Sequence, residues 1–451
     1  MAKVIKAKKA YSQNPLKSSA PLGAALAYLG IEQSLPLFHG SQGCSVFGML
    51  LALRHFGEEL TVHSTGMNEL TSVLGGRESL QDAILTLAKT AQPKLIGVAS
   101  TALVETSGED WIDEIRQLEV QRARELGETV VVSASTPDFD GALEEGWAAA
   151  VSALLERLVD GPLPRQAGRI NVLPGVHQTS AELDELRTYV SHFGLSARIV
   201  PEVAAAGGHT PARNGLHAFS GAKLSDVAQL GAAEHTLALG EHMAGAAEWL
   251  ARRTGVPYTV LHAWTGLEGT DQLVQLLGQL SGVAAPEVLR RERTRLCDAY
   301  LDAGFWFSGK RVAIAGDPDL LYPLSEVFAT LGAQLVTAVA STGRASVLRR
   351  VRAQELLVSD LGDFEEHARA AQAELLVTHS HGRMAAERLG VPLYRVGFPI
   401  FDRLGVQDRC WVGYSGTRRL VHELANVFAA AGTPGPAPCS THDMGYATKR
   451  L

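Results

Sequence analysis

The sequence predicts an α/β protein of three doubly wound, Rossmann-like domains, each with a parallel sheet, arranged in series. Short β-branched runs alternate with segments of helix length, which is the pattern of parallel βα units. The chain has 451 residues, enough for about three domains if each takes ~150 residues. Hydrophobic residues make up 46% of the chain, which is ample for several buried cores.

The first domain is expected over residues 1–165. Its strands are predicted at 94–99 and 129–133, where valine, isoleucine and threonine are frequent. Helices are predicted at 111–126 and 141–159, one after each strand. Glycine and proline then interrupt the chain and end the domain.

The second domain is expected over residues 166–284 and repeats this order. Strands are predicted at 169–173 and 197–200, and helices at 181–193 and 271–280. Ligand sites in such folds lie at the carboxyl ends of the strands.

The third domain is expected over residues 310–431 and opens with a strand at 310–315. A helix is predicted at 322–331, and further strands at 334–340 and 374–378.

Two segments lie outside the three predicted domains. Residues 285–309 are expected to form a connecting helix, because the stretch is long, free of breakers and rich in arginine on one side. Residues 432–451 contain three prolines within 433–438 and are expected to form a flexible C-terminal tail.

The composition bears on which partners and which compartment are expected for the chain. The net charge of −7 gives no reason to expect binding to nucleic acid or an anionic membrane surface. No apolar run reaches the ~20 residues of a membrane-spanning helix. The first nine residues contain lysines without a following apolar core, so no signal peptide is expected. Four cysteines in so long a chain do not suggest a disulfide framework, and we expect a reducing cytoplasm.

The stretch from Phe38 to Cys44 is the most informative part of the sequence. Gly40 and Gly43 leave the backbone open to close approach of a bulky group. Cys44 precedes an apolar segment, 45–53, that is predicted to be helical, and a thiolate in the first turn of a helix is favoured by the helix dipole. One thiolate cannot hold an iron–sulfur cluster, which usually takes four. Cys44 is therefore either a buried thiol or a ligand whose companions lie on another chain.

The remaining cysteines offer weaker candidates. Cys297 lies inside the predicted connecting helix and Cys410 beside a tryptophan, so packing is expected for both. Cys439 and His442 in the tail are a further candidate pair for a metal, and ligation by them is not expected. No two cysteines have the C-x-x-C spacing of a self-contained zinc or cluster site.

Two further motifs follow predicted strands of the third domain. Residues 316–319, Gly-Asp-Pro-Asp, resemble a nucleotide-binding turn but lack the glycine spacing of a phosphate loop. His379 and His381 fall where α/β sites occur, and either hydrogen bonding or ligation by them is open, with hydrogen bonding the favoured role.

Several segments together resemble the β-type subunits of the nitrogenase molybdenum-iron protein family. The similarity extends over nearly the whole chain, to about Ala431. The segments that carry it are 14–24, 39–44, 100–110, 136–139, 316–319 and 395–403. The resemblance implies the three-domain fold of nitrogenase component 1.

The departures from the family pattern indicate the kind of member. In the catalytic β subunit, three cysteines of these segments help to hold the eight-iron P-cluster. The matching positions here are Ser19, Cys44 and Ala102, so one thiolate remains and a P-cluster is not expected. The His39–Cys44 version of the loop resembles the β-type subunit of the scaffold on which the iron–molybdenum cofactor is assembled.

This resemblance implies a non-catalytic scaffold that pairs with a NifE-like α-type subunit in an α2β2 heterotetramer. It further implies a [4Fe–4S] cluster at each subunit interface, with three cysteines from the partner and Cys44 from this chain. Gly40, Ser41 and Gly43 would shape the cluster pocket. The precursor of the iron–molybdenum cofactor would be held mainly by the partner, and the nitrogenase iron protein would dock transiently while molybdenum and homocitrate are added.

Two other classes of function stay open at this stage. One is a catalytic β-type subunit of a nitrogenase-like reductase, acting on dinitrogen or a tetrapyrrole. The other is a nucleotide-binding α/β enzyme acting alone, against which the missing phosphate loop weighs.

Overall fold

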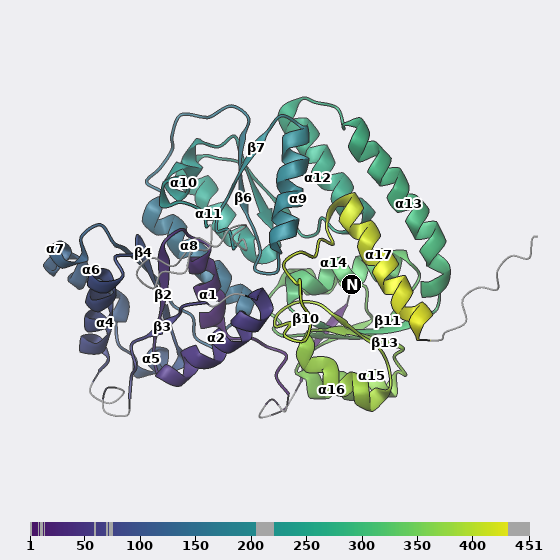
Figure 1. The fold of residues 1–451 in the computed structure, drawn as a ribbon, viewed down its shortest axis with the longest axis horizontal. Helices are drawn as coiled ribbons and strands as arrows, with labels where there is room; N and C mark the ends of the chain where they lie inside the picture. Colours follow the sequence, from purple (N-terminus) through teal and green to yellow (C-terminus); the bar gives the residue numbers. More distant parts are fainter. Residues whose placement is uncertain are drawn as a thin grey trace, which may run out of the picture.

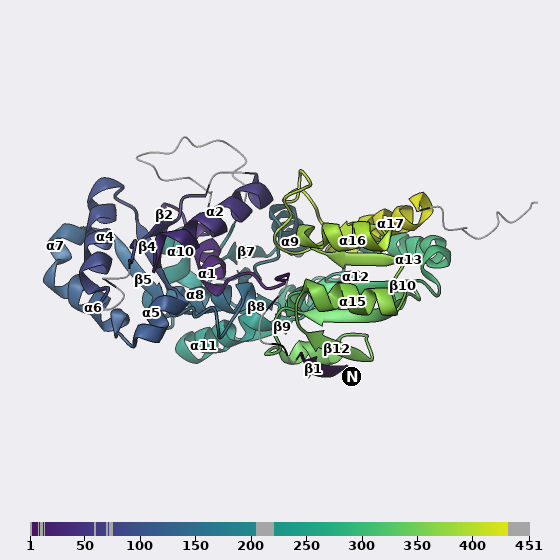
Figure 2. The same ribbon diagram turned by 90° about the horizontal axis from the view of Figure 1, so that it is seen from below.

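The computed structural model describes residues 2–7, 9, 12, 14–57, 60–68, 71, 75–203 and 221–431. These residues form three α/β domains whose sheets are parallel throughout (Figures 1 and 2). The predicted tail at 432–451, with Cys439 and His442, lies outside the described residues. No helix within the described part of the chain is long and apolar enough to cross a membrane.

The first domain contains a four-stranded sheet in the order β3–β2–β4–β5. Both central strands are buried along their whole length, as expected of strands covered on both faces. The strands are β2 (Ser34–His39), β3 (His63–Ser64), β4 (Leu95–Ser100) and β5 (Val130–Ala134). The helices are α1 (Ala20–Leu29), α2 (Gln42–Phe56), α4 (Arg77–Thr90), α5 (Ala102–Ser107), α6 (Trp111–Gln121), α7 (Ala123–Leu126) and α8 (Leu143–Leu158).

The second domain contains a sheet in the order β7–β6–β8–β9. Its strands are β6 (Arg169–Leu173), β7 (Ser196–Ile199), β8 (His235–Leu239) and β9 (Tyr258–Leu261). Its helices are α9 (Ser180–His192), α10 (Leu224–Ala228), α11 (Ala244–Thr254) and α12 (Gly266–Ser281), with the short 3-10 helices η1 (Gln229–Ala232) and η2 (Glu241–Met243). The long helix α13 (Glu287–Phe307) then leads to the third domain (Figure 1).

The third domain contains a six-stranded sheet in the order β1–β12–β11–β10–β13–β14. The strands are β1 (Lys3–Lys6), β10 (Arg311–Gly316), β11 (Gln334–Ala340), β12 (Glu355–Val358), β13 (Leu375–Thr378) and β14 (Leu393–Arg395). The helices are α14 (Pro318–Thr330), α15 (Leu361–Ala370), α16 (Arg383–Leu389) and α17 (Gly413–Ala430), with the 3-10 helices η3 (Ser346–Arg350) and η4 (Ser380–Gly382).

The predicted fold class is confirmed, with differences at particular elements. Residues 3–6 were expected within the first domain and no strand was predicted there, but they form β1, which pairs in parallel with β12 at the edge of the third sheet. The helix expected at 322–331 begins at Pro318, because a proline fits the first helical turn, where no amide hydrogen is needed. The helix expected at 111–126 is divided into α6 and α7 at Arg122. Helix α2 begins at Gln42, so Cys44 lies within its first turn and not at the end of a loop.

Helices α1 and α8 cross at very short distance in the core of the first domain. A Cβ atom added at Gly146 of α8 would lie 1.8 Å from the carbonyl oxygen of Ala20, and one at Gly23 of α1 would lie 2.0 Å from that of Leu143. Only glycine allows backbones to approach so closely. This crossing fixes the position of the first turn of α8, which carries Glu144.

In each sheet the strand order reverses beside the first long strand of the domain. The reversal falls between β2 and β4, between β6 and β8, and between β10 and β13. Crevices at the carboxyl ends of such strand pairs are the usual ligand sites of doubly wound folds. The reversal points of the second and third domains face each other across the domain junction, as the bonds between η2 and α14 described below show.

Candidate functional site

The turn between β2 and α2 carries the residues that the sequence singled out. β2 ends at His39, Gly40 follows, and Ser41 occupies the N-cap position of α2. Cys44 is the third residue of this 15-residue helix. The partial positive charge of the helix N-terminus stabilises a thiolate at such a position.

Gly40 has a structural reason to lack a side chain. The neighbouring strand β4 pairs with β2 up to His39 and Ser100, so the two turns that follow lie side by side. Thr101 donates from its amide and its hydroxyl to the carbonyl oxygen of His39, at 3.1 and 3.0 Å. A Cβ atom on Gly40 would lie 2.2 Å from Thr101 Oγ1. The absence of a side chain at Gly40 therefore leaves room for Thr101. The role of Gly40 in a cluster pocket stays a prediction.

Gly43 differs from Gly40, because it borders open space. A Cβ atom there would meet nothing within 4 Å among the described residues. The same helix exposes Val46, Leu50 and Leu53 by 58, 49 and 39%, spaced as one face of a helix. Its opposite face packs on the core of the first domain. We call the exposed face, Val46, Leu50 and Leu53, the α2 stripe; a helix apolar on both faces is typical of one that a partner covers.

The two other positions matched to P-cluster cysteines offer no sulfur. Ser19 caps α1, and its Oγ accepts a hydrogen bond from the amide of Leu22 at 3.3 Å. Ala102 is the first residue of α5. Of the three matched positions, Cys44 alone carries a thiol.

His39, at the end of β2, is fully buried and neutral. Its Nδ1 lies 3.2 Å from Thr65 Oγ1, and burial lowers its pKa to about 4. A neutral imidazole beside the β2–α2 turn adds no charge to the surroundings of Cys44.

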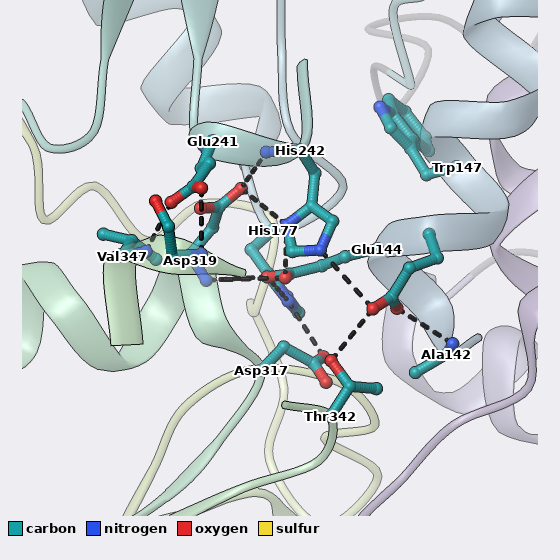
Figure 3. Close-up of polar contacts among 12 residues, drawn as sticks. Ala142, Glu144, Trp147, His177, Glu241, His242, Asp317, Asp319, Thr342 and Val347 are labelled. Atoms are coloured by element: carbon teal, nitrogen blue, oxygen red, sulfur yellow. Dashed lines mark hydrogen bonds and ion pairs between the residues drawn. The ribbon is translucent and has the colours of Figure 1, made fainter. Parts of the chain in front are cut away.

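A second site lies where the three domains meet, and Figure 3 shows its side chains facing one another. We call it the interdomain cluster, which consists of Glu144, His177, His242, Asp317 and Asp319. Glu144 is in the first turn of α8, His177 follows β6, His242 lies in η2 after β8, and the two aspartates flank Pro318 after β10. The strand ends thus deliver residues of the second and third domains to one point, as doubly wound folds do.

Glu144 is the central residue of the interdomain cluster. Its Oε1 lies 3.2 Å from His177 Nε2, and its Oε2 lies 2.8 Å from His242 Nδ1. Each histidine also meets one aspartate: His177 Nε2 lies 3.0 Å from Asp317 Oδ2, and His242 Nδ1 lies 3.1 Å from Asp319 Oδ2. Two histidine–aspartate pairs therefore share one glutamate.

The aspartates are further held by the backbone and by a serine. Asp319 accepts hydrogen bonds from the amides of Glu241 and His242 at 2.8 and 3.1 Å, while its own amide donates to Glu144 Oε1 at 3.1 Å. Asp317 accepts a hydrogen bond from Ser341. Backbone amides and the hydroxyl of Ser341 thus fix the orientation of the two aspartate side chains.

The close charges shift the pKa values strongly. Burial alone would lower the pKa of His177, but the neighbouring carboxylates of Asp317 and Glu144 raise it to about 10. Burial also opposes the charged form of His242, yet Glu144 and Asp319 raise its pKa. Burial raises the pKa of Glu144, and the charge of His242 only partly offsets this effect. The carboxylates of the cluster therefore favour the protonated, positively charged forms of His177 and His242.

Sequence reasoning found two of the five residues of the interdomain cluster. Asp317 and Asp319 were noted in the 316–319 turn, whereas Glu144, His177 and His242 were missed. The only signal in the sequence for the two histidines was their position shortly after strands of the second domain. Glu144, in the first turn of α8, had no such signal.

The other candidate residues have structural roles. His379 Nε2 donates to the carbonyl oxygen of Leu16 at 3.1 Å, Nδ1 accepts from the amide of His381 at 3.3 Å, and burial lowers the pKa of His379 to about 4. Hydrogen bonding, the favoured role for His379, is what the structure contains. Cys410 is buried, which raises the pKa of its thiol to about 12, and Cys297 lies half-buried in α13.

Comparison with known families identifies the class of this protein. Residues 19–429 match the family model described as nitrogenase component 1 type oxidoreductase. The chain belongs to this family. A solved chain titled "Nitrogenase Cp1 at pH 6.5" has the same fold, with a TM-score of 0.88, 29% identity, and coverage of 94% of this chain and 95% of that one.

Within the family, several similar curated proteins carry the name NifN. A nitrogenase iron-molybdenum cofactor biosynthesis protein NifN of Sinorhizobium fredii is 46% identical, with 97% of both chains covered. The NifN proteins of Rhizobium meliloti and Klebsiella pneumoniae are 46 and 35% identical, over 95% of this chain and 97 and 93% of theirs. The resemblance predicted from the sequence is confirmed at this level.

Proposed function

We propose that this chain is a scaffold subunit for biosynthesis of the nitrogenase iron–molybdenum cofactor. In this role it pairs with a NifE-like α-type subunit in an α2β2 heterotetramer and contributes one ligand, Cys44, to a [4Fe–4S] cluster at the subunit interface. The name of the NifN relatives, which cover nearly the whole chain, supports the assembly role.

The observation that carries the proposal is Cys44 in the first turn of α2, on the helix that bears the exposed α2 stripe. A single thiolate is too few for a [4Fe–4S] cluster, so the remaining ligands have to come from another chain. Burial of exposed apolar side chains such as Val46 and Leu50 stabilises an interface. The ligand and the surface for the partner are thus on one element.

The residues around Cys44 fit such a cluster. The open space beside Gly43 leaves room for an inorganic group, and the helix N-terminus favours the thiolate form that binds iron. A cluster bound there would supply one-electron transfer. The chain itself would position the sulfur and exclude water when the partner covers α2.

The same residues weigh against a catalytic nitrogenase β subunit. Ser19 uses its oxygen to cap α1, and Ala102 has no ligand atom, so an eight-iron cluster would lack two of its thiolates on this side. The larger precursor is expected to be held mainly by the partner, and the nitrogenase iron protein to dock on the complex while the precursor is matured with molybdenum and homocitrate.

The experiment that tests the function separates assembly from catalysis. The purified complex with its α-type partner should restore active cofactor to a cofactor-free nitrogenase when supplied with iron protein, molybdate and homocitrate. It should reduce neither dinitrogen nor a tetrapyrrole under the same conditions. Turnover of either substrate by the complex, without transferable cofactor, would mean that the complex is a reductase and not an assembly scaffold.

Cys44→Ala with Cys297→Ala as control connects this function to the cluster ligand. Cys297 lies half-buried in α13, which is apart from α2 in both views (Figures 1 and 2), so its loss removes a thiol without touching the site. We expect transfer of cofactor to fall in Cys44→Ala and to persist in Cys297→Ala.

A further inference from the structure

The interdomain cluster has no part in the proposed function, which depends on α2. We propose that Glu144, His177 and Asp317 bind one divalent first-row transition-metal cation, such as Zn²⁺, at the junction of the three domains.

The donor set and its spacing fit such an ion. One imidazole nitrogen and two carboxylate oxygens are common zinc ligands, at bonds of about 2.0 Å, and in a tetrahedron this places ligand atoms about 3.3 Å apart. His177 Nε2 lies 3.2 Å from Glu144 Oε1 and 3.0 Å from Asp317 Oδ2. The three ligand atoms lie within 4.8 Å of one another. Small side-chain movements would complete three corners of the coordination sphere.

The nitrogen of His177 gives an independent reason. Its side chain is nine-tenths buried, and Nε2 has no hydrogen bond of acceptable geometry to any described residue, although two carboxylate oxygens lie close by. A buried polar atom without a hydrogen bond is costly. A cation between the three atoms would displace the proton that the carboxylates favour on His177, accept the lone pair of its imidazole and remove this cost.

The charges of the cluster also call for a cation. Glu144, Asp317 and Asp319 face the two histidines, and Glu145 lies 3.6 Å from His242. Four carboxylates thus surround two imidazoles, and a dication would add positive charge where carboxylates are in excess. Buried charges are stable only when they are balanced in this way or bind a metal.

Neighbouring groups hold the ligands in place, as is usual around bound metals. Ser341 donates to Oδ1 of Asp317, which leaves Oδ2 directed at His177. The amide of Asp319 holds Glu144, and the α1–α8 crossing fixes the backbone that carries it.

A cavity gives the site space for an incoming ion and a water ligand. It is lined by Glu144, His177 and His242 and bordered by Trp147 and Trp264. Because each ligand comes from a different domain, the cation would join all three domains at one point.

Cobalt titration of the full-length chain tests the site. After removal of metal by a chelator, Co²⁺ is added and its visible absorption bands are followed, with Zn²⁺ content measured by mass spectrometry. We expect about one tightly bound equivalent per chain and a higher unfolding temperature with metal than without. His177→Gln and Asp317→Asn should each weaken binding at least about 100-fold.

His235→Gln is the matched control, because His235 is a buried histidine of β8 whose Nε2 lies 2.9 Å from Thr259 Oγ1, outside the cluster. It should bind Co²⁺ as the unaltered chain does. Cys44→Ala should also leave this site intact, so failure of the interfacial cluster and failure of the cation site are distinguishable.

A crystal of the unaltered protein grown with Zn²⁺ makes the test independent of how the variants fold. An anomalous-scattering peak bounded by Glu144, His177 and Asp317 is the expected result. Absence of a peak there, or equal Co²⁺ binding by His177→Gln and the unaltered chain, would mean that the cluster is a buried ion-pair network only.

Discussion

Gly146→Ala should destabilise the first domain, because the added methyl group would collide with a backbone. The new Cβ atom would lie 1.8 Å from the carbonyl oxygen of Ala20, whereas ordinary contact begins near 3.4 Å. Helices α1 and α8 would have to separate by about 1.6 Å, the difference between these distances. Overpacking of this kind costs about 1–3 kcal/mol, and the upper end applies because neither partner is a flexible side chain.

Gly304→Ala in α13 is the matched control for this prediction. A Cβ atom on Gly304 would meet nothing within 4 Å, so the change adds a better helix former without a collision and should stabilise by up to about 1 kcal/mol. Urea unfolding followed by circular dichroism and tryptophan fluorescence measures both variants. Equal stability of Gly146→Ala and the unaltered chain would refute the close crossing.

Two other predictions concern the partner surface and pH. Leu50→Asp places a charge in the α2 stripe and should weaken pairing with the α-type partner at least about tenfold, about 1.4 kcal/mol, in a binding titration. Leu301→Asp, at an exposed leucine of α13, is the control, and equal loss in both would contradict an interface on α2. Stability should fall as pH drops from about 6.5 toward 4, because burial lowers the pKa of His39 and His379 to about 4 and that of His55 to about 3, while unfolded histidines titrate near 6.5. The unfolded chain then binds more protons than the folded chain in this window. Each of these histidines therefore lowers the free energy of unfolding by roughly 2 kcal/mol at pH 5, and this loss is absent above pH 6.5. Unfolding midpoints that do not change between pH 7 and 5, or a slope unaltered in His379→Gln, would count against these buried neutral histidines.

The sequence was sufficient for the fold class, because parallel central strands are buried on both faces and appear as short apolar runs. The runs at 169–173 and 334–340 coincide with β6 and β11. Strand β1 was missed, since Lys3–Lys6 is a short edge strand with two lysines and lies in the sheet only through its partner β12, about 350 positions away.

The interdomain cluster could be predicted only in part, for the same physical reason. Asp317 and Asp319 are two positions apart and follow a clear strand. Glu144, His177 and His242 come from separate elements with no motif spacing, and only packing of the three domains brings them together. Cys44 was found because the segments around it resemble a known family, and its helix begins two residues before it.

Electron paramagnetic resonance of the reduced chain, alone and purified anaerobically with its α-type partner, tests the central claim most directly. The account predicts a reducible [4Fe–4S] signal in the pair, absent from the chain alone, lost in Cys44→Ala and retained in Cys297→Ala. A signal from the chain alone, or an unchanged signal and iron content in Cys44→Ala, would contradict it.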